Sequence, residues 1–101
     1  MSRVVGIIFR PVATKSQHSQ PYQSLPLFLR ELREEAGLSQ RDLGRRLGKP
    51  QSWIYNCESA NRRVDITEFI GWAISCGIEP GAAFARFLEA ETRRQGRKKK
   101  E

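Results

Sequence analysis

The chain has 101 residues, a formal net charge of +7 and 39% hydrophobic residues. This length gives one domain with one modest core, and the basic balance favours a polyanionic partner such as nucleic acid or an anionic membrane. Two cysteines and one histidine exclude a disulfide framework and a metal-ligand cluster. We therefore expect reduced core thiols and no metal or other cofactor.

Residues 1–24 are predicted to form an N-terminal arm. The apolar run Val4–Phe9 favours one short strand, because valine and isoleucine prefer extended backbone. The run is too short for a signal peptide or a membrane span, so we expect a cytoplasmic protein with no membrane contact. Four possibilities stay open for it: pairing with a second copy, docking on the domain, holding a protein partner, or disorder. Residues 11–24, rich in Ser, Gln and Pro, form a linker in which His18 is solvated.

From Leu25 onward, apolar residues recur at helical spacing and predict an all-α core of five helices. Ser24 is predicted to cap the first helix, with Pro26 in its first turn, and Gly37 to end it. Ser39 is the predicted cap of the second helix, which ends at Gly48. The five helices are expected at about 25–36, 39–47, 50–59, 65–76 and 80–88.

The second and third predicted helices have the spacing of a helix-turn-helix. Leu43 and Leu47 face the core from one helix, and Ile54 and Cys57 face it from the next. Gly44, between the two leucines, lets the helices cross closely, and the turn needs a residue such as Gly48. In this motif the second helix stands out from the domain and fits a DNA major groove.

The stretch LSQRDLGRRLGKPQSWIYNCE resembles the helix-turn-helix of the phage-repressor or Cro-like family, often called the XRE family. The flanking stretches LPLFLRELREEAG and VDITEFIGWAISCGIEP are similar to that family's first helix and to its fourth helix with the entry to the fifth. The resemblance covers residues 25–88. It implies a DNA-binding domain at 25–90. The charged composition of residues 91–101 predicts a basic disordered tail that either solubilises the protein or binds DNA.

The resemblance also implies which side chains contact DNA. The residues expected at base edges are Gln51, Ser52, Tyr55 and Asn56, and those expected at phosphates are Gln40, Lys49, Trp53, Arg62 and Arg63. Tyr55 can instead contact the backbone, and Trp53 can instead pack its ring on the first helix. Three basic residues of the second helix, Arg41, Arg45 and Arg46, are expected to form a solvated face.

The sequence departs from the family pattern at three positions. Pro50 stands where a capping Ser or Thr is frequent, so one cap bond is lost. Ala60 replaces a frequent glycine after the third helix, which could reshape that turn. Cys57 is smaller than the usual Ile or Leu and should loosen the core by about 1 kcal/mol.

These patterns predict a sequence-specific regulator of transcription that binds double-stranded DNA, acting as a repressor and as a homodimer on two half-sites. Phe84, Phe87 and Leu88 either form the dimer face or complete the monomer core. The alternative is an antitoxin-like or other protein-interaction module on the same fold. An enzyme is not expected, because the sequence has no nucleophile–base pairing, acid pair or phosphate-binding glycine loop.

Overall fold

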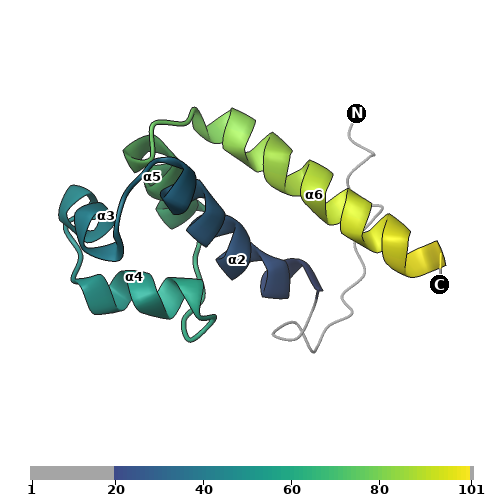
Figure 1. The fold of residues 1–101 in the computed structure, drawn as a ribbon, viewed down its shortest axis with the longest axis horizontal. Coiled ribbons are helices and arrows are strands. Elements are labelled where there is room, and N and C mark those ends of the chain that lie inside the picture. The colour runs from purple at the N-terminus through teal and green to yellow at the C-terminus, as the bar shows by residue number, and fades with distance from the viewer. Residues whose placement is uncertain (1–19, 101) are drawn as a thin grey trace, which may run out of the picture.

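The computed structural model describes residues 20–100, with side chains described from 24 to 94, and this part of the chain is all helical (Figure 1). The arm predicted at Val4–Phe9 lies outside these residues. The helices are α2 (Gln20–Glu35), α3 (Gln40–Leu47), α4 (Gln51–Glu58), α5 (Ile66–Ser75) and α6 (Pro80–Lys100). The predicted all-α fold of five helices is confirmed.

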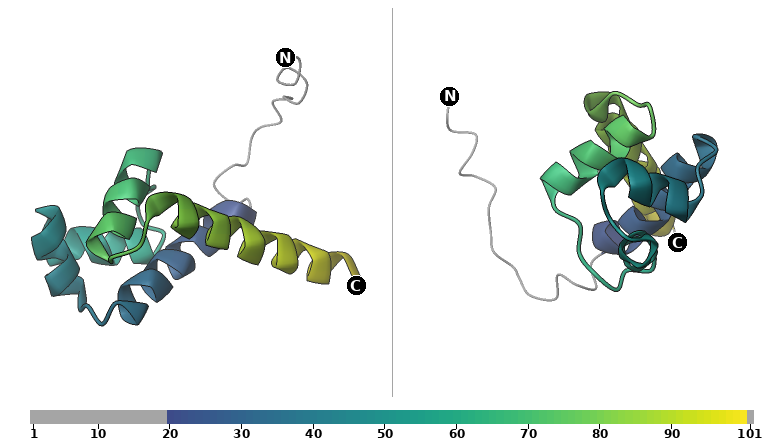
Figure 2. Two further views of the ribbon diagram at one scale, coloured as in Figure 1. Left: turned by 90° about the horizontal axis from the view of Figure 1, so that it is seen from above. Right: turned by 90° about the vertical axis from the view of Figure 1, so that its left-hand side faces the viewer.

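Helix α2 lies at the centre of the arrangement, between α4 and α6 (Figure 1). Helix α3 packs on α4 and on α5, and α5 packs in turn on the first half of α6 (Figure 2). Helices α3 and α4 therefore lie at one end of the molecule. The last turns of α6 extend away from the opposite end.

The core is formed by side chains from all five helices. The largest of the fully buried ones are Leu29, Leu32, Leu43, Ile54, Cys57 and Trp72, and α6 contributes Ala83. Trp72 fills the centre, and its indole N–H donates to the backbone oxygen of Leu29 over 3.0 Å. This bond satisfies the one polar atom of a side chain that otherwise contributes only apolar surface.

Helix α3 begins with the predicted cap. The amide of Asp42 donates to the Ser39 hydroxyl over 2.9 Å, and the amide of Ser39 donates to the Asp42 carboxylate over 3.0 Å. Asp65 and Glu68 form the same reciprocal pair at the start of α5. Each box satisfies two amides that the helix leaves unpaired, so both helices have defined starts.

Helix α2 begins earlier than predicted, at Gln20 rather than near Leu25, and Pro26 lies inside it. Ser24 is therefore not a helix cap. Its hydroxyl instead donates to the Glu91 carboxylate of α6 over 2.6 Å. A serine before an apolar run predicts a helix cap. The same pattern also occurs where the serine side chain bonds to another helix, as Ser24 does here.

The predicted domain end at residue 90 lies inside α6, whose backbone stays helical to Lys100. The contact from Ser24 to Glu91 ties this part of α6 to α2. Residues 85–94 are mostly alanine, glutamate, arginine and leucine, which have high helix propensity. Residues 91–100 of the predicted tail therefore belong to α6.

Both cysteines are free thiols in the core, as the sequence predicted. Burial raises the pKa of the Cys57 thiol, and burial raises the pKa of Cys76 to about 11. Both groups are therefore protonated at neutral pH and act as small apolar side chains. None of the helices within residues 20–100 is long and apolar enough to span a bilayer.

Candidate nucleic-acid interface

The turn between α3 and α4 depends on two glycines. Gly48 ends α3 in the left-handed conformation, with φ 70° and ψ 34°. A Cβ atom on buried Gly44 would lie 2.6 Å from the backbone oxygen of Lys49, so only glycine allows the turn to pass this close. The sequence predicted that Gly44 lets the two helices cross closely, and the structure brings both the turn and the first residue of α4 to Gly44, with Gln51 N 3.6 Å from the same Cβ position.

Helix α4 exposes its polar side chains at its first turns. Pro50 occupies the cap position without a side-chain cap bond, as expected. Gln51, Ser52 and Tyr55 are exposed, and Tyr55 remains 52% accessible. Asn56 is half-buried, and its side-chain oxygen accepts from the side-chain NH₂ group of Asn61 over 3.2 Å. Three of the four predicted base-contacting residues therefore face solvent together, while Asn56 also supports the loop that follows.

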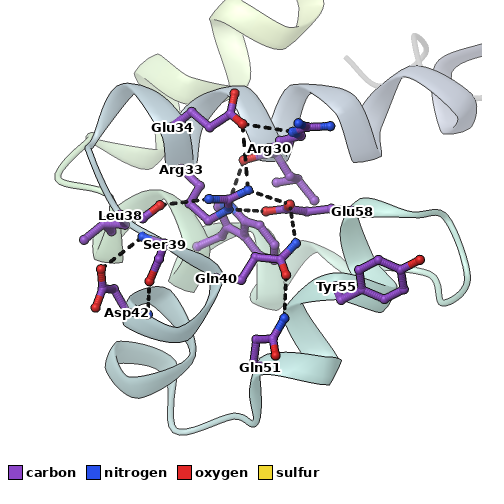
Figure 3. A network of polar contacts seen from close by, with 12 residues as sticks. Arg30, Arg33, Glu34, Leu38, Ser39, Gln40, Asp42, Gln51, Tyr55 and Glu58 are labelled. Carbon is purple, nitrogen blue, oxygen red and sulfur yellow. Dashed lines mark hydrogen bonds and ion pairs between the residues drawn. The ribbon is translucent and has the colours of Figure 1, made fainter.

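A chain of polar contacts runs from the core to Gln51 (Figure 3). The Arg33 guanidinium of α2 donates to both carboxylate oxygens of Glu58 in α4, over 2.6 and 2.9 Å. The Gln40 amide donates to the same carboxylate over 3.0 Å. The Gln51 amide then donates to the Gln40 side-chain oxygen over 2.7 Å.

These contacts set the orientation of both glutamine amides. A carboxylate only accepts, so Gln40 must turn its NH₂ group to Glu58 and its oxygen to Gln51. Gln51 must then direct its NH₂ group to Gln40. Within the described part of the chain its side-chain oxygen has no donor, so this oxygen and the second N–H remain available. One acceptor beside one donor is the pattern that pairs with the N6 and N7 edge of adenine.

The starts of α3 and α4 meet at a shallow concave surface. It is lined by Arg33, Ser39, Gln40, Arg41 and Gln51. Helix N-termini carry partial positive charge and attract phosphate groups. Gln40 therefore lies at a helix end whose partial charge is favourable for a phosphate group.

Trp53 packs against the core, beside Trp72 of α5. Its ring lies 6.4 Å from that of Trp72, centroid to centroid. Two cations lie near the same ring: Lys49 Nζ is 4.9 Å from its centroid and Arg62 Cζ is 4.8 Å away. Trp53 therefore gathers two of the predicted phosphate contacts around one half-buried aromatic surface.

Arg62 makes several contacts within the domain. Its guanidinium donates to the Glu68 carboxylate over 3.1 and 3.5 Å and approaches the Cys57 sulfur at 3.9 Å. Arg62 lowers the pKa of Glu68, and Glu68 raises the pKa of Arg62. Arg63, next in the chain, is exposed in the same loop.

The turn after α4 has alanine, not glycine, in the left-handed conformation. Ala60 is the one non-glycine residue with positive φ, 66°, in the described part of the chain. Ala60 thus adopts a conformation that is strained for a residue with a Cβ atom. This conformation of Ala60 sets the path of the chain into the loop that contains Arg62 and Arg63.

Sequence reasoning missed the residues that support this surface. Arg33, Glu58, Glu68 and Trp72 were not assigned roles, although Arg33 is buried and Trp72 is fully buried. A charged residue on the predicted inner side of a helix is a usable signal, because such a residue needs a partner of opposite charge. Among the described residues, no three His, Cys, Asp or Glu side chains are grouped to hold a metal ion.

The fold and the polar side chains exposed on α4 define a helix-turn-helix DNA-binding domain. The model of a family described as "Helix-turn-helix domain" matches residues 25–94. A solved structure described as an XRE-family like protein from Pseudomonas syringae pv. tomato is 37% identical to this chain. Its TM-score is 0.67, and the match covers 75% of this chain and 93% of that chain. The chain belongs to the XRE-type helix-turn-helix family, which places it among DNA-binding transcription regulators.

A second solved structure, the clp gene regulator ClgR from Corynebacterium glutamicum, has a TM-score of 0.68 at 12% identity. That match covers 80% of this chain and 86% of that chain. At this identity the similarity shows the fold alone. No curated protein sequence matches the chain.

Proposed function

We propose that the chain is a sequence-specific repressor that binds double-stranded DNA as a homodimer, with α4 in the major groove. The orientation of Gln51 carries this proposal. Its amide is set by Gln40, which is set in turn by the Arg33–Glu58 pair. A side chain fixed before binding loses little conformational entropy on contact with a base, and it presents one defined hydrogen-bonding pattern.

The remaining α4 residues extend the contact along the groove. Ser52 and Tyr55 are exposed on the same helix as Gln51. Ser52 accepts from or donates to several bases, and Tyr55 offers an apolar ring edge to a thymine methyl group. We propose that Asn56 contributes from the last turn of α4, beside the loop that it bonds.

Phosphate contacts fix the position of α4 on the duplex in this proposal. Gln40 at the start of α3 contacts the phosphate on one side, and Lys49, Trp53, Arg62 and Arg63 contact the backbone on the other. Lys49 and Arg62 are already gathered at the Trp53 ring. A domain held across a promoter in this way excludes polymerase from the same DNA, which is the physical basis for repression.

The test is enrichment of duplexes from a random pool at near-physiological salt. We expect a two-fold symmetric motif whose half-sites lie about 10 base pairs apart, one turn of the duplex. Gln51→Ala should then cost about 1–3 kcal/mol on the selected site and little on a scrambled duplex. Retention of all duplexes alike, with equal loss for Gln51→Ala on both, would refute base reading by α4. A promoter carrying the selected site should show lower reporter output when the protein is present.

A further inference from the structure

Exposed isoleucines follow one side of α5. Ile66, Ile70 and Ile74 are four residues apart, so they form a stripe along the helix. They are 60%, 40% and 60% exposed. Their neighbours Phe69 and Ala73 are buried in the core. The sequence placed all five on one apolar face, but the monomer covers only part of it.

Helix α6 continues this apolar surface. The ring of Phe84 meets the ring of Phe69 edge-on at 6.1 Å, where α5 packs on the first half of α6 (Figure 2). Phe84 is 44% exposed, and Leu88, one turn further, is 49% exposed. We call Ile66, Ile70, Ile74, Phe84 and Leu88 the α5–α6 patch. These are five of the seven large hydrophobic residues that are exposed in the described part of the chain.

Four positions beside the patch carry no charge: Thr67 and Gly71 on α5, and Gly81 and Ala85 on α6. Two acidic residues, Asp65 and Glu89, lie next in the chain to Ile66 and Leu88 at its ends. Charged residues occur on other sides of these helices, as where Arg86 of α6 pairs with Glu35 of α2 at 3.0 Å. Because the chain carries a net charge of +7, two copies repel each other least where neither presents a charge. Nucleic acid, in contrast, gains nothing from an uncharged apolar surface.

The size of the patch also fits a second copy. Five side chains that are 40–60% exposed present on the order of 500 Å², against about 800 Å² per partner in a standard interface. The uncharged residues beside these five side chains supply part of the remaining interface area. The exposed polar residues Gln51, Ser52 and Tyr55 belong to α4, so pairing through α5 and α6 requires none of them.

We propose that the α5–α6 patch is the face through which two copies of this chain pair. The inference deepens the proposed function and rests on it for the use of the dimer, which presents two α4 helices to DNA. From the sequence, Phe84, Phe87 and Leu88 were either a dimer face or part of the monomer core, and the patch contains Phe84 and Leu88 but not Phe87. Phe87 is half-buried against Phe28, with ring centroids 5.3 Å apart, and belongs to the monomer core.

The experiment is sedimentation equilibrium of the full chain without DNA. We expect a mass of two chains for the wild type. The double variant Ile70→Glu/Ile74→Glu should raise the dimer dissociation constant about 100-fold or more, since it buries two charges from each chain at the interface. Leu27→Glu is the matched control, because Leu27 is 56% exposed but lies on α2, outside the patch. This control should leave the mass of two chains unchanged.

A milder variant, Ile70→Ser/Ile74→Ser, keeps the test valid if the two glutamates disturb folding. Circular dichroism checks the helix content of both variants. A wild type that is monomeric at every concentration would overturn the proposal. So would a dimer that both patch variants leave intact, or one that only Leu27→Glu dissociates. Because DNA is absent, these outcomes do not depend on base reading. A monomeric patch variant that still binds one half-site in a Gln51-dependent way would support both proposals separately.

Discussion

The guanidinium of Arg33 and the carboxylate of Glu58 form a nearly buried ion pair with a shortest contact of 2.6 Å, and their side chains are only 10% and 5% exposed. The pair joins α2 to the last turn of α4. Arg33 also donates to the backbone oxygen of Leu38 over 2.8 Å, at the entry to α3. One arginine therefore fixes three helices relative to each other. Its partner Glu58 accepts from the Gln40 side chain and so orients that side chain.

Glu58→Gln should lower the free energy of unfolding by about 3 kcal/mol, because it leaves the Arg33 charge buried without a counter-charge. The measurement is urea unfolding followed by circular dichroism. Glu34→Gln is the control. Glu34 lies 4.0 Å from Arg33 but is 52% exposed, so its loss should cost less than about 1 kcal/mol. Equal losses for the two variants would contradict the importance assigned to the buried pair.

Gln40 and Gln51 should be coupled energetically in DNA binding. In a double-mutant cycle on the selected site, Gln40→Ala and Gln51→Ala should lose less together than the sum of the single losses. The expected coupling is about 0.5–2 kcal/mol. The reason is that Gln51 keeps its orientation only while Gln40 accepts its N–H. Fluorescence anisotropy with a labelled duplex measures each corner, and additive losses would show that the two amides act independently.

The helix-turn-helix could be predicted from sequence because its signals are local. Leu43, Gly44, Gly48 and Ile54 each have a role that their spacing reveals, and the structure places Leu43 and Ile54 in the core as expected. The candidate site residues Gln51 and Ser52 follow from the same register. Whether they contact DNA stays a prediction.

The features that the sequence did not reveal depend on contacts between distant segments. Ser24 bonds Glu91 across 67 positions, and the Trp72 indole bonds Leu29 across 43. Helical spacing gives the face on which a side chain lies, but not the partner that covers it. For the same reason the isoleucines of α5 could be placed on an apolar face but not recognised as exposed.

Gly44→Ala should destabilise the domain by about 1–3 kcal/mol, since its new methyl group would lie 2.6 Å from the Lys49 oxygen and the turn would have to shift. Gly71→Ala is the matched control in α5. Its Cβ would meet Leu47 at an ordinary 3.5 Å, so the variant should gain about 0.5–1 kcal/mol from helix propensity. Thermal unfolding compares the two, and a Gly44→Ala variant as stable as the wild type would show that the turn has room.

Acid should destabilise the domain through its two capping boxes. Hydrogen bonds from the backbone and side chain of Ser39 lower the pKa of Asp42 from its usual 3.8, and hydrogen bonds from the Glu68 amide and from Thr67 lower the pKa of Asp65. A lowered pKa in the folded state means that the unfolded chain takes up the proton first. This stabilisation is therefore complete above about pH 4 and is lost as the pH falls through the lower, folded values.

The double variant Asp42→Asn/Asp65→Asn removes these titrating groups while keeping a side-chain oxygen at each position. It should lose less stability than the wild type between pH ~5 and ~2. Urea unfolding across this range measures both proteins. Parallel pH profiles would show that other carboxylates, with Glu68 the first to test, dominate the acid response.

Ala60→Gly should stabilise the domain by about 1 kcal/mol. Ala60 holds φ 66°, where its Cβ crowds the following carbonyl oxygen, and glycine removes this strain. The greater backbone entropy of glycine in the unfolded chain offsets part of the gain. The loop of Arg62 and Arg63 keeps its backbone shape in this variant, so DNA affinity and its salt dependence should not change. Urea unfolding and anisotropy titrations at several salt concentrations test both statements. A loss of stability would mean that the left-handed turn is not strained, because glycine would then add only its entropic cost.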